Sequence, residues 1–155
     1  MRLSLLFLLV LLTIIPACSA QSNGGAPQSE ETYADVTAVE VRGDSADYTF
    51  SVTIRSPDTG CEQYANWWEV VSPDGTHLIH RRVLAHPHTN EQPFTRSGGP
   101  VAIAPDSTVV VRAHMNKAGY GGQALRGTVD DGFIEAELPE VFGDEIEEAS
   151  PDCGF

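Results

Sequence analysis

The chain has 155 residues, of which 22 are acidic and 9 are Lys or Arg, so its formal net charge at pH 7 is −13. So few basic residues argue against nucleic acid as a partner, because binding to the phosphate backbone depends on clustered Lys and Arg side chains. Anionic lipid headgroups should also repel such a chain. The length suffices for one hydrophobic core and is too short for two domains.

The first twenty residues, MRLSLLFLLVLLTIIPACSA, have the organisation of a secretory signal. One Arg precedes an apolar run over residues 3–16, which is shorter than the roughly 20 residues of a membrane span. The run ends in Ile15-Pro16-Ala17-Cys18, which resembles the lipobox of bacterial lipoproteins. The resemblance implies that residues 1–17 are removed and that Cys18 carries a diacylglyceryl thioether and an acyl chain such as palmitate. The alternative is an ordinary secretory signal that ends beside a cysteine.

A lipidated Cys18 would fix the protein to a membrane, because each buried methylene contributes about 0.8 kcal/mol and several chains act together. By analogy with the lipoprotein sorting rule, Ser19 indicates the outer membrane, facing the periplasm or the cell surface. Residues 18–32 are polar and contain Gly, Ser and Gln, which predicts a flexible tether. We therefore expect a lipid-anchored protein of the cell envelope.

Two strands are predicted directly after the tether. In DYTFSVTIRS, residues 47–56, apolar and polar residues alternate, and this period of two is typical of a half-buried strand. The preceding run, residues 33–43, is rich in β-forming residues. Gly43, Asp44 and Ser45 supply a turn between them, so residues 33–56 are expected to form a hairpin or two neighbouring strands.

Residues 63–85, QYANWWEVVSPDGTHLIHRRVLA, predict a second hairpin. Its turn is Ser72-Pro73-Asp74-Gly75, where Pro presets one dihedral and Gly accepts positive φ. The neighbouring Trp67 and Trp68 should point to opposite faces of the strand, so that one fills the core and the other reaches the far face. The outward Trp is expected to pack beneath a loop; the alternative is a surface of Trp67, Trp68 and Arg96 on which a sugar could stack.

The later segments complete the predicted fold. Residues 100–115, PVAIAPDSTVVVRAHM, indicate a short strand, a turn and a strand from about Thr108 to Met115, and residues 124–138 indicate one or two more. About seven strands with turns every 8 to 12 residues predict an all-β protein: a single antiparallel β-sandwich over residues 33–142. This spacing, with a Trp in the third strand, resembles immunoglobulin and fibronectin type III sandwiches, a likeness that implies no particular activity.

Two cysteines remain if Cys18 is lipidated. Cys61 and Cys153 are an even pair in an exported, oxidising compartment, and we expect a disulfide rather than two free thiols. It would tie residues 143–155 to the domain. Ten acidic residues follow Arg126 and no Lys or Arg does, so this end is expected to be a solvated acidic segment.

The histidines offer a candidate metal site. His86 and His88 flank Pro87 and in an extended chain would project to the same side, about 6–7 Å apart. Neutral imidazole suits Cu or Zn, and a third ligand would have to come from Glu91, His80 or His114. His114 alternates with buried positions of its strand and is expected on the less buried side.

The sequence contains no Gly-x-Ser-x-Gly motif and no phosphate-binding glycine loop, so no catalysis is expected. We predict a lipid-anchored cell-envelope protein that acts as a non-catalytic binding module for an envelope protein or a glycan, without nucleic acid. The alternative is a periplasmic module that binds Cu or Zn through the His86 and His88 segment. No other cofactor is expected.

Overall fold

The computed structural model describes residues 32–154, so the signal segment, Cys18 and the tether up to residue 31 lie outside the described residues. The described part contains eight strands: β1 (Asp35–Asp44), β2 (Asp47–Arg55), β3 (Ala65–Val71), β4 (Leu78–Val83), β5 (Phe94–Val101), β6 (Val109–Met115), β7 (Ala124–Thr128) and β8 (Gly132–Ala136). Within it, no helix has the length and apolar character needed to cross a membrane.

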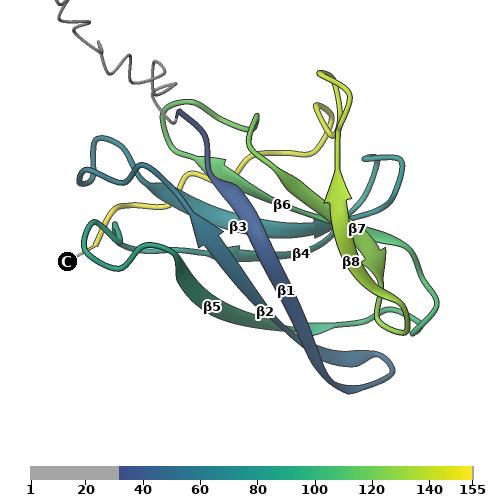
Figure 1. Ribbon diagram of the computed structural model, residues 1–155. Helices are drawn as coiled ribbons and strands as arrows, with labels where there is room; N and C mark the ends of the chain where they lie inside the picture. Colours follow the sequence, from purple (N-terminus) through teal and green to yellow (C-terminus); the bar gives the residue numbers. More distant parts are fainter. Residues whose placement is uncertain (1–31, 155) are drawn as a thin grey trace, which may run out of the picture.

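The strands form two antiparallel sheets that pack as a sandwich (Figure 1). One sheet has the order β1-β2-β5 and the other the order β4-β3-β6-β7-β8. The predicted all-β antiparallel sandwich is confirmed, with eight strands where the sequence indicated about seven. The additional strand comes from residues 124–136, which form a full hairpin that turns at Gly132, where φ is +82°.

Both predicted hairpins are present. The β1–β2 register ends with Asp44 opposite Asp47, next to Gly43 at a φ of +112°. In the β3–β4 turn the amide of Gly75 donates to the carbonyl of Ser72 at 2.9 Å, and Gly75 has a φ of +76°. Residues that favour positive φ therefore indicated the positions of both hairpin turns in the sequence.

The main core lies between the two sheets. Alternate residues of β2 meet those of β3 and β6 there, and Trp68 is the largest side chain, with none of its surface exposed. A fully buried apolar side chain of this kind contributes roughly 1.5–3 kcal/mol. The inward half of each alternating pattern thus forms the core as predicted.

Strands β3 and β6 are buried on both faces, which their alternation did not predict. The outer face of the five-stranded sheet is covered by residues 137–154, here called the C-terminal strap, seen in yellow in Figure 1. Its apolar side chains pack against a second, small cluster formed by Val71, Val110 and Ala124. His114, expected on a less buried face, is therefore only 4% exposed.

Strand β5 begins at Phe94, earlier than the short strand predicted from residue 100. Gly98 and Gly99 lower the β propensity of this stretch. The sequence therefore did not indicate that the strand begins before residue 100. A Cβ on Gly98 would lie 2.8 Å from His80 Nε2 and 2.9 Å from the Trp68 ring. Glycine is required here because the core aromatic side chain approaches the backbone.

Candidate binding site

A buried cluster of charges forms the centre of the outer face of the five-stranded sheet. Glu69 on β3 lies directly opposite Arg81 on β4 and Arg112 on β6 in the strand register. The Arg81 Nε donates to Glu69 Oε2 at 2.9 Å, and the Arg112 Nε donates to Glu69 Oε1 at 2.7 Å. The Glu69 side chain is fully buried, so each of its oxygens is paired with its own guanidinium.

The C-terminal strap supplies the acceptors that this cluster lacks. Two guanidiniums against one carboxylate leave one positive charge in excess. Arg81 Nη1 donates to the carbonyl of Glu147 at 2.8 Å, and Arg112 donates to the carbonyls of Phe142 and Gly143. Because an unpaired buried charge is costly, these backbone carbonyls stabilise the excess charge.

Aromatic rings enclose the cluster. Trp67 and His114 are cross-strand neighbours and their rings stack with centroids 3.7 Å apart. The Trp67 indole N–H donates to the Tyr120 hydroxyl at 2.8 Å, and the Arg112 guanidinium lies 3.6 Å from the Tyr120 ring centroid. Guanidinium–ring contacts of this kind are favourable when shielded from water, and they fix Arg112 in place.

The two titratable rings that contact the cluster, His114 and Tyr120, are uncharged at neutral pH. Burial is the main cause that lowers the pKa of His114 to about 4, with Glu69 opposing the shift and the two arginines adding to it. Its Nδ1 lies within hydrogen-bond distance of Asn66 Oδ1, at 2.7 Å. Burial and the Glu69 charge raise the pKa of Tyr120. The cluster therefore carries a net single positive charge.

A cleft of about 1140 Å³ opens beside the cluster, between residues 120–123 and the strap. Arg112 and Tyr120 reach it from the cluster, and the other main contributors are Tyr33, Glu135, Phe142 and Glu148. Concave sites with aromatic walls and a few polar groups are the usual form of ligand sites. Aromatic rings, one guanidinium and several carboxylates line this cleft.

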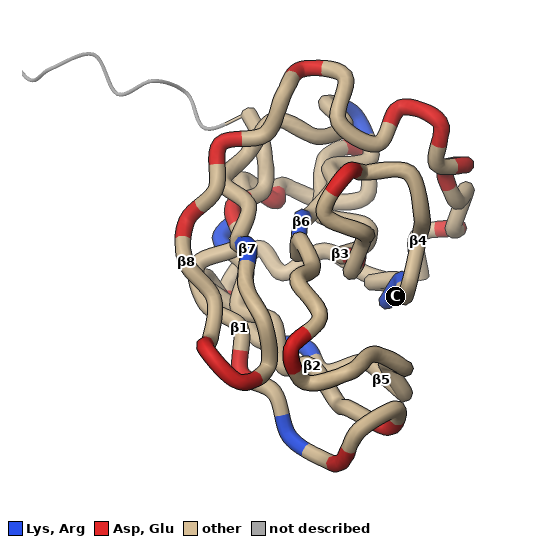
Figure 2. Tube along the Cα trace, turned by 90° about the vertical axis from the view of Figure 1, so that its right-hand side faces the viewer, with Lys and Arg blue, Asp and Glu red and all other residues tan. Residues whose placement is uncertain are grey.

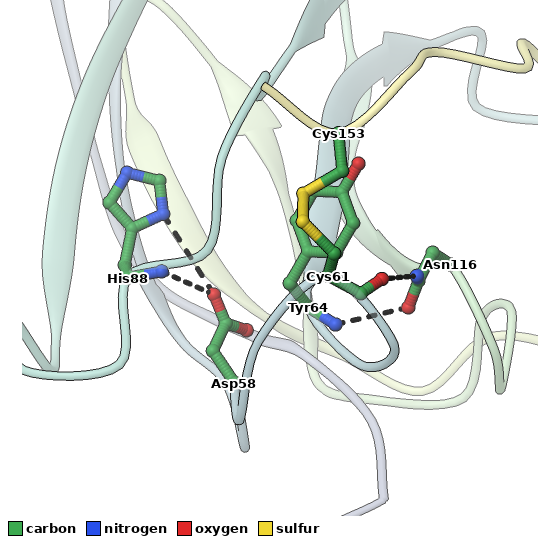
Figure 3. Close-up of a disulfide and its surroundings, with 6 residues drawn as sticks. All are labelled: Asp58, Cys61, Tyr64, His88, Asn116 and Cys153. Carbon is green, nitrogen blue, oxygen red and sulfur yellow. Dashed lines mark hydrogen bonds and ion pairs between the residues drawn. A yellow bond between two sulfur atoms is a disulfide. The ribbon is translucent and has the colours of Figure 1, made fainter. Parts of the chain in front are cut away.

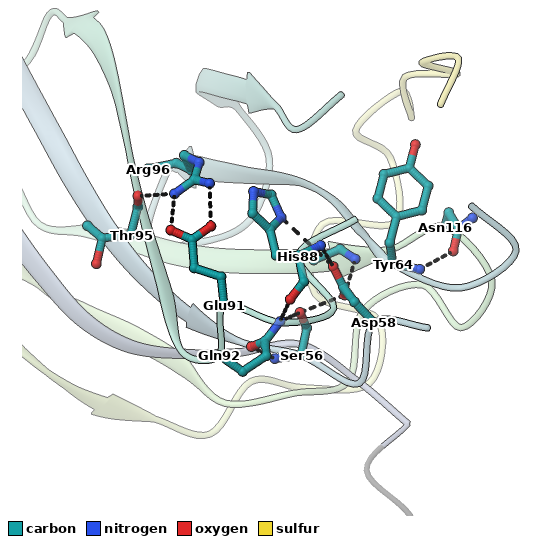
Figure 4. Close-up of polar contacts among 10 residues, drawn as sticks. Ser56, Asp58, Tyr64, His88, Glu91, Gln92, Thr95, Arg96 and Asn116 are labelled. Atoms are coloured by element: carbon teal, nitrogen blue, oxygen red, sulfur yellow. Dashed lines mark hydrogen bonds and ion pairs between the residues drawn. The ribbon is translucent and has the colours of Figure 1, made fainter. Parts of the chain in front are cut away.

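The predicted histidine pair follows the C-terminal end of β4, whereas the β3–β4 turn precedes its N-terminal end. The rings of His86 and His88 are 4.7 Å apart. His88 is buried, stacks on Phe94 and lies with its Nδ1 3.9 Å from Asp58 Oδ2 (Figure 4). Burial, with the charges of Arg96 and His86, lowers the pKa of His88. This ring is thus neutral and packed as a core side chain.

The remaining proposed metal ligands have other partners. Glu91 pairs with Arg96 at 2.8 Å (Figure 4), and His114 lies beneath the strap with its Nε2 3.5 Å from Glu148. His80 packs beside Trp68. Among the described residues there is no group of three side chains placed to hold a metal ion, so the set His86, His88, Glu91 and His114 is not brought together.

Trp67, Trp68 and Arg96 do not share an exposed surface, and the outward Trp packs beneath a covering segment. Trp68 fills the core, and Trp67 on the far face is only 1% exposed. Tyr120, Arg81 and His114 cover the Trp67 ring. Arg96 is on the other sheet, over the Phe94 ring.

Four residues of the cluster were not predicted: Glu69, Arg81, Arg112 and Tyr120. A carboxylate in the middle of the apolar run NWWEVV is a signal, because a buried strand seldom carries an unpaired charge. Identifying its partners required the register of three strands, of which β6 is distant in sequence. The spacing alone did not supply that register.

The expected disulfide between Cys61 and Cys153 is present and closes a separation of 92 residues (Figure 3). Asn116 supports the Cys61 loop, since its side-chain amide donates to the Cys61 carbonyl at 2.8 Å and accepts from the Tyr64 amide at 3.0 Å. The amide of Gly154 donates to the carbonyl of Ala85. These contacts fix the far end of the strap.

Comparison with known proteins gives one informative relative. A protein of Halomicrobium mukohataei named "Putative lipoprotein" is 38% identical over 107 residues, which are 69% of this chain and 51% of the relative. The chain thus spans about half the length of that relative. No family model matches the chain. No solved structure matches it either, so the likeness to immunoglobulin and fibronectin type III sandwiches stays a prediction.

Proposed function

We propose that the protein is a lipid-anchored lipoprotein of the cell envelope whose β-sandwich binds an envelope protein or glycan without catalysis. The observation that carries this proposal is the similarity, over 69% of the chain, to a protein named as a lipoprotein. It agrees with the independent lipobox resemblance of residues 15–18. We place the anchor in the outer membrane, with the domain facing the periplasm or the cell surface.

The cleft is the part of the domain best suited to hold the partner. It combines aromatic rings, one guanidinium and several carboxylates. Tyr33, which follows the tether, lines it. Residues 18–32, if fully extended, span about 50 Å. An anchor on Cys18 would therefore keep the cleft within about that distance of the membrane.

The anchor is tested by replacing Cys18 with Ser in a host with a lipoprotein pathway. The wild type should enter the detergent phase on phase separation, incorporate labelled palmitate and lose residues 1–17. The Cys18→Ser variant should remain unprocessed or be released, whereas Ser19→Ala should still be lipidated. An unchanged mature mass and unchanged membrane association in Cys18→Ser would refute the anchor.

The binding role is tested by recovering partners from membranes with the full lipoprotein. Glu137→Arg and Glu140→Arg reverse exposed charges that line the cleft and should reduce recovery of a specific partner at least tenfold. Glu40→Arg, an equally exposed reversal on β1, is the matched control and should have no effect. Equal recovery by all variants would exclude the cleft as the binding site.

A further inference from the structure

The C-terminal strap has two parts that are held by different forces. The first part, residues 137–146, packs Leu138, Phe142 and Ile146 against the sheet. Gly143 has a φ of +77°, and a Cβ there would lie 2.5 Å from the Arg112 guanidinium. The first part of the strap therefore packs closely against the sheet and the Arg112 guanidinium.

The apolar cluster on the outer face of the sheet includes no residue of the second part, residues 147–154. The contacts of this part with the sheet are the Glu147 carbonyl on Arg81 and the Glu148 carboxylate 3.5 Å from His114. Its far end is held by the bond between Gly154 and Ala85 and by the disulfide. Most of its residues are exposed. The covalent link, rather than hydrophobic burial, thus keeps this part on the sheet.

The surface beneath the second part suits the chemistry of its present occupant. Arg81 belongs to a cluster with one positive charge in excess, and its Nη1 donor is satisfied by a strap carbonyl. The segment EEASPD, residues 147–152, contributes that carbonyl and three carboxylates. Any extended acidic peptide offers the same two features: backbone carbonyls in a row and negative charge.

We propose that residues 147–154 occupy a docking site for an extended acidic peptide, and that reduction of the Cys61–Cys153 disulfide opens this site. The inference deepens the proposed binding function and depends on it only for the identity of the natural partner. Both cysteines are partly exposed, so a reductant can reach them. The strap is then an internal competitor that the disulfide holds at high effective concentration.

The opening step is a thiol–disulfide exchange with a dithiol reductant. One thiolate of the reductant attacks a disulfide sulfur and forms a mixed disulfide, and its second thiol displaces the cysteine. The Cys61–Cys153 bond breaks, each protein sulfur gains a proton, and the reductant becomes a disulfide. Two electrons pass from the reductant to the protein.

The test uses a fluorescent peptide of residues 147–152 and fluorescence anisotropy with the purified chain. Reduced and alkylated protein should bind the peptide at least tenfold more tightly than oxidised protein. In the reduced form, Arg81→Gln should weaken binding about tenfold, and a peptide with its three acidic residues replaced by Lys should not bind. These measurements need no anchor and no natural partner, so they can fail independently of the proposed function.

A second form of the protein is the control for unfolding of the reduced chain. Six Gly and Ser residues inserted between Ser150 and Pro151 leave the disulfide intact but let residues 147–150 leave the sheet, at a small cost in loop entropy. Near-ultraviolet circular dichroism confirms that the core is folded. Peptide binding by this oxidised form supports the proposal. Absence of binding to both opened forms, or equal binding to the closed form, overturns it.

Discussion

Glu69 is fully buried between two guanidiniums on a sheet face where a sandwich strand usually meets water. Such a triad gains little over an apolar replacement of similar volume, because desolvation offsets the attraction. Removing Glu69 is different, since it leaves Arg81 and Arg112 as uncompensated buried charges. The role of Glu69 is therefore to hold Arg81 and Arg112 in fixed positions on the sheet.

The substitution Glu69→Gln should lower the free energy of unfolding by about 3–5 kcal/mol, because both guanidiniums lose their counter-charge. Urea unfolding followed by tryptophan fluorescence measures the change. The matched control is Glu91→Gln, which breaks the exposed pair with Arg96 and should cost no more than about 1 kcal/mol. Equal effects of the two substitutions would contradict this account of the cluster.

His114 makes stability depend on pH. Its pKa is about 4 in the folded protein and about 6.5 in an unfolded chain. Between these values the unfolded state binds more protons, so stability falls as pH falls from 6.5 towards 4. His114 alone should account for a loss of about 2 kcal/mol between pH 7 and pH 5.

Urea titrations of His114→Gln at pH 7 and pH 5 check this expectation. The variant should lose less stability on acidification than the wild type does. A residual dependence should remain, because burial also lowers the pKa of His80 and His88. The exposed turn residue His77, changed to Gln, is the control and should keep the wild-type difference. An undiminished pH dependence in His114→Gln would contradict the assignment.

At the scale of elements, the C-terminal strap buries the outer face of the five-stranded sheet. The disulfide links it to the Cys61 loop across 92 residues, and a cross-link over such a separation typically contributes 2–4 kcal/mol. Cys153→Ala should lower the free energy of unfolding by this amount, and faster amide exchange in residues 147–152 should accompany the loss. Cys61→Ala should behave identically. A change below about 0.5 kcal/mol in both variants would show that the strap holds without the link.

The sequence predicted the elements whose signals are local. The alternation of residues 47–56 and the turn residues of two hairpins located β1 to β4, and the even number of cysteines indicated the disulfide. The double burial of β3 and β6 depends on the strap, whose three packing residues are dispersed among acids and resemble a solvated segment. The Glu69 cluster depends on the pairing of β3 with β6, a contact between distant segments. Leu138, Phe142 and Ile146 recur at every fourth position, a spacing that does not indicate a strand, and the pairing of β3 with β6 leaves no periodic signal.

At the scale of the molecule, the acidic residues lie mainly at the periphery, along the loops and the strap (Figure 2). Removal of residues 1–17 would take away Arg2 and no acid, which leaves 8 basic against 22 acidic residues. Such a domain repels anionic headgroups. An anchored domain should therefore stand away from the membrane, as far as its tether allows, with the strap and the cleft accessible to other envelope components.

The same charge distribution predicts that salt stabilises the fold. Raising NaCl from 0.1 M to 1 M shortens the Debye length from about 10 Å to about 3 Å, which screens repulsion among the surface carboxylates. The buried pairs of Glu69 are screened far less, because water and ions do not reach them. The melting temperature of the chain from Ser19 onward should therefore rise by several degrees, at roughly 4 °C per kcal/mol for a domain of this size. Replacing Asp144, Glu145 and Glu147 with their amides should reduce that rise. A melting temperature that falls with salt would mean that attractive surface pairs, rather than repulsion, dominate the exterior.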